Sequence, residues 1–382
     1  MTDHDAALDT HDNGPKKTPL YDLHVELGGK TVDFAGWSLP VQYPAGIMAE
    51  HRHCREKAGL FDVSHMGQVR LRGANVASGA SVASAFERLV PGNIEGLKPG
   101  NARYTQFTDE NGGVLDDLIA SRTDDGLFVV INAGCRDADI AHMRSNLEPE
   151  FQVEELTEQA LLALQGPSAV GVLAELAPEA ASLTFMQTME TTLAGVPARV
   201  SRLGYTGEDG FEISIAAGDA VDLARRLLEH DDVMPIGLGA RDSLRLEAGL
   251  CLYGHELTPE ITPIEAGLGW SIGKRRREEG GFPGSDVIRT QLVNGPSRRL
   301  VGIRPEGRAP AREGTEIQDR DGRAIGLVSS GGFGPTVGGP ISMGYVPPEH
   351  AESGSDVTLI VRGKANPARI VALPFTPHRY RR

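Results

Sequence analysis

Two short segments of the sequence carry acidic side chains that could take part in chemistry. In the first, Val114-Leu-Asp-Asp-Leu-Ile119, the adjacent Asp116 and Asp117 interrupt an apolar run. Successive residues of a β-strand point to opposite faces, so each aspartate has apolar neighbours on its own face. At least one carboxyl group is therefore expected to be partly desolvated, which raises its pKa and suits it to proton transfer. The pattern equally allows one solvated and one hydrogen-bonded aspartate.

The second segment is Arg202-Leu-Gly-Tyr-Thr-Gly-Glu-Asp-Gly-Phe-Glu212. It leads into a predicted strand in which Phe and Ile alternate with polar or small residues, and this alternation places Glu212 on the face opposite Phe211. The glycines of the turn leave room for a backbone or a flat ligand to approach closely. A carboxylate beside such a turn can accept two parallel hydrogen bonds from a planar donor, such as a guanidinium group or an aminopyrimidine ring. For this segment taken alone, a hairpin with an exposed glutamate is the simpler interpretation.

Other polar side chains give weaker signals. Arg241 lies near the start of a predicted helix, residues 240–248, where its charge and the helix dipole could bind an anion. His65 could serve as a general base, although a structural, hydrogen-bonded histidine is the favoured interpretation. The run Lys274-Arg-Arg-Arg277 is the most basic point of an acidic protein. A solvated surface patch is favoured there, and a docking patch for an acidic partner is the alternative.

Length and composition describe a globular protein of several domains. The chain has 382 residues, of which 40% are apolar and 24% charged, and this is enough for two or three domains with substantial cores. Its net charge of -14 disfavours binding to nucleic acid or to anionic membranes. No apolar run approaches the length of a membrane span. The acidic segment 1–12 lacks Lys and Arg, so we expect a disordered leader rather than a signal or transit peptide.

The cysteines are few and scattered. Cys54, Cys135 and Cys251 are widely spaced and form no Cys-x-x-Cys pair. This predicts a reduced, cytoplasmic chain without disulfides or structural zinc. His51 and His53 precede Cys54 closely, which suggests a metal site, but positions 51 and 53 of a helix point to different sides. We therefore expect no bound metal.

The elements that must position these residues are helices and strands in alternation, followed by a β-rich C-terminal part. Three segments are expected to lack regular structure: an aromatic stretch at 34–43, a loop at 59–67 and a Gly- and Pro-rich linker at 278–297. A helix is expected at 76–89. Short strands separated by Gly and Pro turns recur in residues 298–382 and predict a small barrel or sandwich.

Several motifs follow one another in an order that is too regular for chance. They are Thr18-Pro-Leu-Tyr-Asp22, Phe34-Ala-Gly-Trp37, Phe61-Asp-Val-Ser-His-Met66, Gly112-Gly-Val-Leu-Asp-Asp-Leu118, Leu164-Gln-Gly-Pro167, Gly204-Tyr-Thr-Gly-Glu-Asp-Gly-Phe-Glu212, Gly239-Ala-Arg-Asp-Ser-Leu-Arg-Leu-Glu-Ala248, Leu252-Tyr-Gly254 and Thr262-Pro-Ile-Glu265. Together they closely resemble the aminomethyltransferase of the glycine cleavage system, the T-protein family. The resemblance covers nearly everything from Thr18 to Tyr380 and departs from the family pattern at Gly338-Gly-Pro340.

The resemblance implies an α+β multidomain fold, a three-domain cloverleaf with mixed α/β folate-binding domains and a small C-terminal β-barrel. We expect a disordered acidic leader at 1–17, a folate-binding region of two interleaved α/β domains at 18–277, the linker at 278–297 and the barrel at 298–382. The implied reaction transfers the methylene carbon from the S-aminomethyldihydrolipoyl arm of H-protein to tetrahydrofolate. Its products are methylene-tetrahydrofolate, ammonia and dihydrolipoyl H-protein. Tetrahydrofolate is then the co-substrate and lipoylated H-protein the partner, with no role for a metal, nucleic acid or membrane.

The resemblance also assigns roles to residues by their position in the motifs. It implies that Asp117 is catalytic and that the folate-binding residues are Glu212, Arg241, Tyr380, Tyr205, Asn132 and Tyr104. The alternatives are a folate-dependent demethylase or a non-catalytic folate-binding protein on the same fold. The cysteine-containing signature of the non-catalytic relatives is not found in this sequence, and Asp117 is kept.

Overall fold

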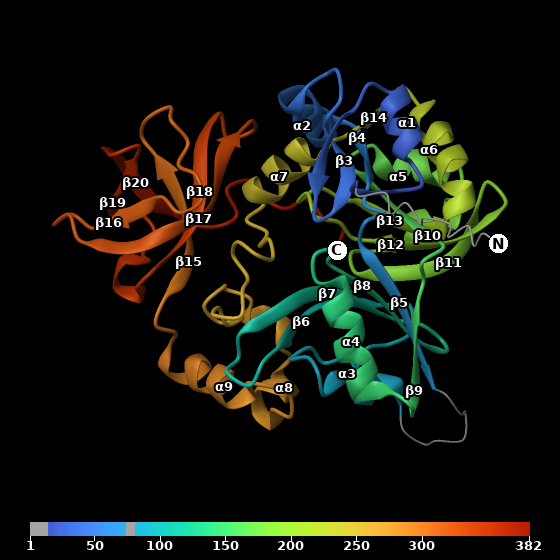
Figure 1. Ribbon diagram of the computed structural model, residues 1–382, viewed down its shortest axis with the longest axis horizontal. Coiled ribbons are helices and arrows are strands. Elements are labelled where there is room, and N and C mark those ends of the chain that lie inside the picture. Colours follow the sequence, from blue (N-terminus) through green and yellow to red (C-terminus); the bar gives the residue numbers. More distant parts are fainter. Residues whose placement is uncertain (1–13, 74–80) are drawn as a thin grey trace, which may run out of the picture.

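The computed structural model describes residues 14–73 and 81–382 (Figure 1). Most of the expected leader and part of the helix expected at 76–89 lie outside these residues. Where the two segments are described, Lys16–Lys17 form the short strand β1 and Val82–Glu87 form helix α3. The leader expected at 1–17 is therefore wrong at its C-terminal end, where the backbone of β1 pairs with a neighbouring strand.

Two β-sheets form the centre of the N-terminal part (Figure 1). One has six strands in the order β11-β12-β13-β10-β4-β14, and the other has five in the order β6-β7-β8-β5-β9. Because the consecutive strands β4 and β5 belong to different sheets, the chain passes directly from one sheet to the other. The strands of the six-stranded sheet are β4 (Ala58–Asp62), β10 (Gln159–Gln165), β11 (Gln187–Leu193), β12 (Val196–Arg202), β13 (Gly210–Ala216) and β14 (Val233–Pro235). Those of the five-stranded sheet are β5 (Gly67–Gly73), β6 (Ala102–Thr108), β7 (Val114–Arg122), β8 (Gly126–Ile131) and β9 (Phe151–Glu155).

Helices cover the outer face of each sheet. On the six-stranded sheet, α6 shows why: Ala220, Leu223, Ala224 and Leu227 follow the spacing of one helical face, and all four are buried against the strands. Helices α1 and α5 contribute to the same core, and α3 and α4 cover the five-stranded sheet. The helices of this region are α1 (Tyr21–Glu26), α2 (Ile47–Glu56), α4 (Arg136–Leu147), α5 (Ala169–Ala174), α6 (Ala220–Leu228) and α7 (Leu238–Glu247).

The inner faces of the two sheets share a third apolar core. Side chains of β4, β8 and β10 meet those of α2 and α7 there. This core fixes the two sheets relative to each other, and it sets the distance between residues that the sequence separates by a hundred positions or more. Within the described residues, no helix combines the length and the apolar character needed to cross a membrane.

The C-terminal strands close into a barrel in the order β15-β18-β17-β16-β19-β20. Aliphatic side chains from these strands fill its interior, and α7 lies against β17 and β18. The α+β architecture with a C-terminal barrel is therefore confirmed. The barrel strands are β15 (Arg299–Pro305), β16 (Glu316–Gln318), β17 (Ala324–Gly334), β18 (Gly339–Val346), β19 (Asp356–Val361) and β20 (Lys364–Val371).

Two of the segments expected to be irregular contain strands. Residues 34–43 include β3 (Trp37–Gln42), which pairs with β1 and with β2 (Lys30–Phe34) in a three-stranded sheet. The expected loop at 59–67 begins with strand β4. Its glycine and aspartate suggest a loop, but pairing with β10 on one side and β14 on the other overrides this local preference.

The segment expected to be a linker also contains regular structure. Lys274–Glu279 form α8, and Ser285–Asn294 form α9. Ile288 of α9 packs with Ile272 and Phe282 in a small core of its own. The high content of Gly, Pro and polar residues at 278–297 reflects the turns that flank α9.

Candidate functional site

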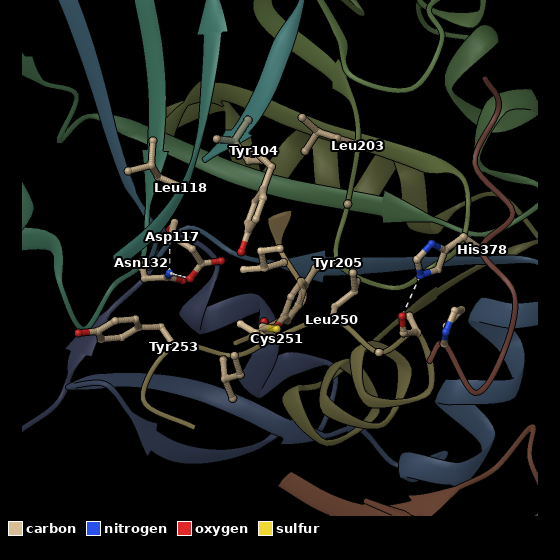
Figure 2. Close-up of a pocket in the computed structure, with 18 of the residues that line it drawn as sticks. Tyr104, Asp117, Leu118, Asn132, Leu203, Tyr205, Leu250, Cys251, Tyr253 and His378 are labelled. Carbon is tan, nitrogen blue, oxygen red and sulfur yellow. Dashed lines mark hydrogen bonds between the residues drawn. The ribbon is translucent and has the colours of Figure 1, made fainter. Parts of the chain in front are cut away.

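A cavity of about 930 Å³ lies where the two sheets, α7 and the barrel meet. Figure 2 shows part of its lining. The seven site residues expected from the sequence all line this cavity: Tyr104, Asp117, Asn132, Tyr205, Glu212, Arg241 and Tyr380. They come from both sheets, from α7 and from the segment after the barrel, so the tertiary fold brings them together. Their assigned roles stay predictions.

Asp117 faces the cavity, as the alternation of β7 requires. Asp116 is fully buried on the opposite face, toward α4, which confirms that the two carboxyl groups are separated by the strand. The side-chain amide of Asn132 donates to Asp117 Oδ1 at 2.9 Å (Figure 2), and the Tyr104 hydroxyl also acts on the carboxylate to favour its ionised form. Burial and the nearby Asp116 charge raise the pKa of Asp117 to about 7, although Tyr104 and Asn132 oppose this rise. Asp117 can therefore take up or release a proton near neutral pH.

Glu212 reaches the cavity from β13. Its neighbour on β10 is Ala163, on the inner face of the sheet, whereas Phe211 and Ile213 pack into the outer core. Burial raises the pKa of Glu212, and the positive charge of Arg241 opposes the rise. Within the described part of the chain, the Glu212 carboxylate makes no hydrogen bond, so its oxygens are free to accept donors from a ligand.

Arg241 is the positively charged group that acts on the pKa of the Glu212 carboxylate. Burial lowers the pKa of its guanidinium group, and the charge of Glu212 counteracts this change. The guanidinium carbon lies 4.8 Å from the centroid of the Tyr205 ring, so a cation–π contact holds the side chain in place. The Tyr205 hydroxyl in turn donates to the backbone carbonyl of Cys251.

The glycines of the turn before β13 serve the protein's own packing. A Cβ atom on Gly210 would lie 2.3 Å from the Leu164 carbonyl oxygen, and one on Gly204 would lie 1.9 Å from Gln165 Oε1. The close approach expected from the sequence is therefore made by neighbouring protein groups at these two positions.

The segment after the barrel closes one side of the cavity. Tyr380 stacks on Phe185 with ring centroids 4.0 Å apart and an interplanar angle of 6°. Burial raises the pKa of Tyr380 to about 12, so its phenol stays neutral at physiological pH. The imidazole Nε2 of His378 lies 2.8 Å from the Ala248 carbonyl oxygen at the end of α7 (Figure 2). These contacts tie the segment to the helix that carries Arg241.

His65 is the clearest difference from the expected site. The sequence favoured a structural histidine with its hydrogen bonds satisfied, and this interpretation is wrong. The side chain is 2% exposed and lines the cavity, and its Nδ1 has no hydrogen-bond partner within the described residues. Burial and the charge of Arg241 lower the pKa of His65 to about 4. The imidazole is therefore neutral near pH 7, and its Nδ1 is a buried nitrogen without a partner in the described residues.

Sequence reasoning also missed Cys251, Tyr253 and Trp270 as cavity residues. Trp270 stacks on Tyr104 with centroids 5.6 Å apart and is 65% exposed, an unusual exposure for this residue type. Tyr253 belongs to a motif that the resemblance already contained. The other available signal was the position of Trp270, because the chain has two tryptophans and this one lies just before the basic run.

The basic run of α8 is mostly structural. Arg276 is 5% exposed, and its guanidinium group donates to the Glu87 carbonyl at 2.8 Å. Arg277 donates through Nε to the Ile272 carbonyl at 2.8 Å. Neither a solvated patch nor a docking patch describes a buried arginine, so both interpretations are wrong for Arg276. The Lys274 side chain is 90% exposed and is available to a partner.

The residues that suggested a metal site have separate partners. His51 lies 2.8 Å through Nδ1 from the Ser243 hydroxyl, and His53 lies 2.9 Å through Nε2 from the Asp232 carbonyl oxygen. The Cys54 thiol is directed at the Gln165 carbonyl oxygen. The three side chains therefore point away from a common centre, as expected for these positions of a helix.

Known proteins match most of the chain. The GCVT N-terminal domain family matches residues 20–276, and the glycine cleavage T-protein C-terminal barrel domain family matches residues 298–376. The chain is 47% identical to the mitochondrial aminomethyltransferase of Pisum sativum, covering 96% of this chain and 90% of that protein. It is 46% identical to that of Gallus gallus, covering 98% and 95%. The crystal structure of glycine cleavage system aminomethyltransferase T from Bartonella henselae superposes with a TM-score of 0.90 at 43% identity, covering 96% of this chain and 99% of that one. The chain therefore belongs to the aminomethyltransferase, or T-protein, family of the glycine cleavage system.

Proposed function

We propose that the aminomethyltransferase activity of this chain takes place in the central cavity, with tetrahydrofolate and the lipoyl arm of H-protein bound there together. The observation that supports this most directly is that polar groups from distant parts of the chain line one largely apolar cavity. Glu212 offers two acceptor oxygens that make no hydrogen bond within the described residues, and Asp117 offers a carboxyl group with a pKa near 7. Such buried groups are costly unless a ligand completes their hydrogen bonds.

The lining fits a reduced folate. A pterin presents an aminopyrimidine edge of adjacent donors, and the free Glu212 carboxylate is the acceptor pair that such an edge requires. Arg241 balances the carboxylate charge, and the flat rings of Tyr104 and Tyr380 supply apolar faces. Tetrahydrofolate, when bound, supplies the two nitrogens that take up the methylene carbon.

The residues of the chain then have distinct tasks. The transfer moves one CH₂ group, and the two protons that the folate nitrogens lose leave with ammonia and with the lipoyl sulfur. Asp117 can hold one of these protons in transit, because burial keeps its pKa near neutral. Asn132 fixes its carboxylate by a hydrogen bond. The apolar walls exclude water, which would otherwise capture the reactive one-carbon unit.

An assay with purified components tests the proposal. Aminomethylated H-protein and tetrahydrofolate should give methylene-tetrahydrofolate and ammonia, whereas methylated amines or thioethers in place of H-protein should give no product. Tetrahydrofolate alone should also raise the melting temperature, because a ligand that binds only the native state stabilises it. Turnover of a methylated amine would instead indicate a demethylase, and stabilisation by folate without any turnover would indicate a non-catalytic binder.

A cytoplasmic location is a separate proposal. It is supported by the three free cysteines, which fit a reducing compartment. The relatives in pea and chicken are mitochondrial by name. Fractionation of the native cells, with an antibody against the protein, tests the location directly.

A further inference from the structure

A second layer of polar groups lies directly behind Asp117. Asp116 is fully buried, and its two oxygens accept hydrogen bonds from Asn132, from the backbone amide at 3.1 Å and from the side-chain amide at 2.9 Å. The same side-chain nitrogen donates to Asp117 Oδ1 at 2.9 Å and to the Asp117 carbonyl oxygen at 3.0 Å (Figure 2). A single amide group therefore joins the buried carboxylate to the one that faces the cavity.

A third aspartate completes this layer from helix α4. Asp139 is 3% exposed, its Oδ2 has no donor partner within the described residues, and its carboxyl group neighbours that of Asp116 closely enough for Asp116 to raise its pKa. Two carboxyl groups in contact away from water cannot both be ionised, so one proton must lie between them. Burial together with the hydrogen bond and charge of Asp116 raises the pKa of Asp139 to about 10, which places the proton on Asp139. A protonated Asp139 can donate to Asp116, which already accepts two hydrogen bonds from Asn132.

We propose that Asp116 and Asp139 are positioning residues for the transfer reaction, a carboxyl–carboxylate pair that fixes the Asn132 amide and, through it, the carboxyl group of Asp117. This assignment rests on the proposed function only in giving Asp117 a role in proton transfer. The geometry itself concerns the free protein. It explains why two buried aspartates, each destabilising alone, occur together behind a cavity wall.

The pair also controls the charge state of Asp117. The negative charge of Asp116 faces Asp117 across the backbone and disfavours its ionisation. The other titratable groups whose charges act on or respond to Asp117 in the described residues have raised pKa values and are neutral near pH 7: Tyr104 of β6, Tyr205 of the turn before β13, Cys135 before α4 and Cys251 after α7. Asp116 is therefore the charged neighbour that keeps a proton available on Asp117.

The test is a titration of the Asp117 carboxyl group by NMR in the free protein, with ¹³C-labelled aspartate and with Asp117→Asn to assign the signal. Asp116→Asn removes the like charge, so the Asp117 midpoint should fall by about one unit or more. The acid limb of the kcat/KM profile should move to lower pH by the same amount. Asp137→Asn is the matched control, because Asp137 is exposed on the first turn of α4, and its midpoint and profile should equal those of the wild type.

A second pair of variants keeps the test decisive if Asp116→Asn does not fold. Asp139→Asn retains a donor toward Asp116, whereas Asp139→Leu removes it. The leucine variant should lose about tenfold or more in kcat, and the asparagine variant should stay near the wild type. Equal kcat in both variants, or an Asp117 midpoint unchanged in Asp116→Asn, overturns the assignment. The NMR midpoint needs no substrate, so it decides the role of the pair even if the protein transfers no aminomethyl group.

Discussion

Replacing Glu212 with glutamine should weaken tetrahydrofolate binding and leave the free protein intact. Glutamine keeps the size of the side chain but turns one acceptor oxygen into a donor. That donor would meet a donor of the aminopyrimidine edge, so one charge-assisted hydrogen bond is lost. Such a bond contributes about 1.5–3 kcal/mol, which corresponds to a loss of affinity of about ten- to a hundredfold.

The free protein should change little, because two effects of the substitution oppose each other. Burial raises the pKa of Glu212, so the ionised side chain destabilises the folded state. The sign follows from linkage: the native state binds the proton more tightly, so stability is greatest below the ordinary carboxyl pKa and falls as pH rises through the raised value. Glutamine removes this cost. It also leaves the buried Arg241 without its compensating charge, which works in the opposite direction.

Calorimetric titration with tetrahydrofolate, alongside thermal melts without ligand, measures both effects. In the wild type, affinity should fall as pH drops through the raised pKa of Glu212, because the protonated side chain accepts fewer hydrogen bonds. In Glu212→Gln this pH dependence should disappear. Unchanged affinity at neutral pH would refute the idea that Glu212 binds the pterin. A large drop in the melting temperature of the free variant would show that Glu212 is instead a structural partner of Arg241.

Three further experiments test other parts of the structure. Asp117→Asn should keep folate affinity within a small factor while turnover falls sharply, and near-normal turnover would remove this residue from catalysis. Arg276→Ser should lower the free energy of unfolding by about 3 kcal/mol, because it leaves buried partners unpaired. Lys274→Ser should change only the KM for H-protein and its salt dependence. Equal melting temperatures for the two variants would contradict the structural role of Arg276. Gly210→Ala should cost about 1–3 kcal/mol in denaturant unfolding through its clash with a strand carbonyl, while Gly218→Ala, which meets open space, should be neutral.

Local periodicity was enough to predict where the side chains of single strands point. The alternation after Gly210 placed Glu212 on the face opposite Phe211, and the alternation of β7 separated Asp116 from Asp117, because a strand that is buried on both sides still alternates strictly. The motifs then supplied the barrel and the list of cavity residues. They could not predict which side chains from distant parts of the chain become neighbours. Nothing in the sequence places Asp139 of α4 near Asp116.

The errors share a physical cause, which is tertiary pairing. Strand β4 contains glycine and aspartate and has little local preference for a strand, but its neighbours on both sides complete its backbone hydrogen bonds. Arg276 reads as a surface residue until α8 packs against the carbonyl groups at the end of α3. His65 was expected to have a partner because most buried histidines do. Within the described residues its Nδ1 has none, and which groups surround a buried ring is a property of the assembled fold.

The passage of the chain from β4 directly into β5 sets the order in which the protein can assemble during its synthesis. Strand β5 has its sheet partners once β9, ending at Glu155, has left the ribosome. Strand β4 must wait for β10 and finally for β14, Val233–Pro235. We therefore expect the five-stranded sheet to form first, with β4 held beside it as an unpaired apolar strand. That interval is when the nascent chain is most open to aggregation and most dependent on chaperones.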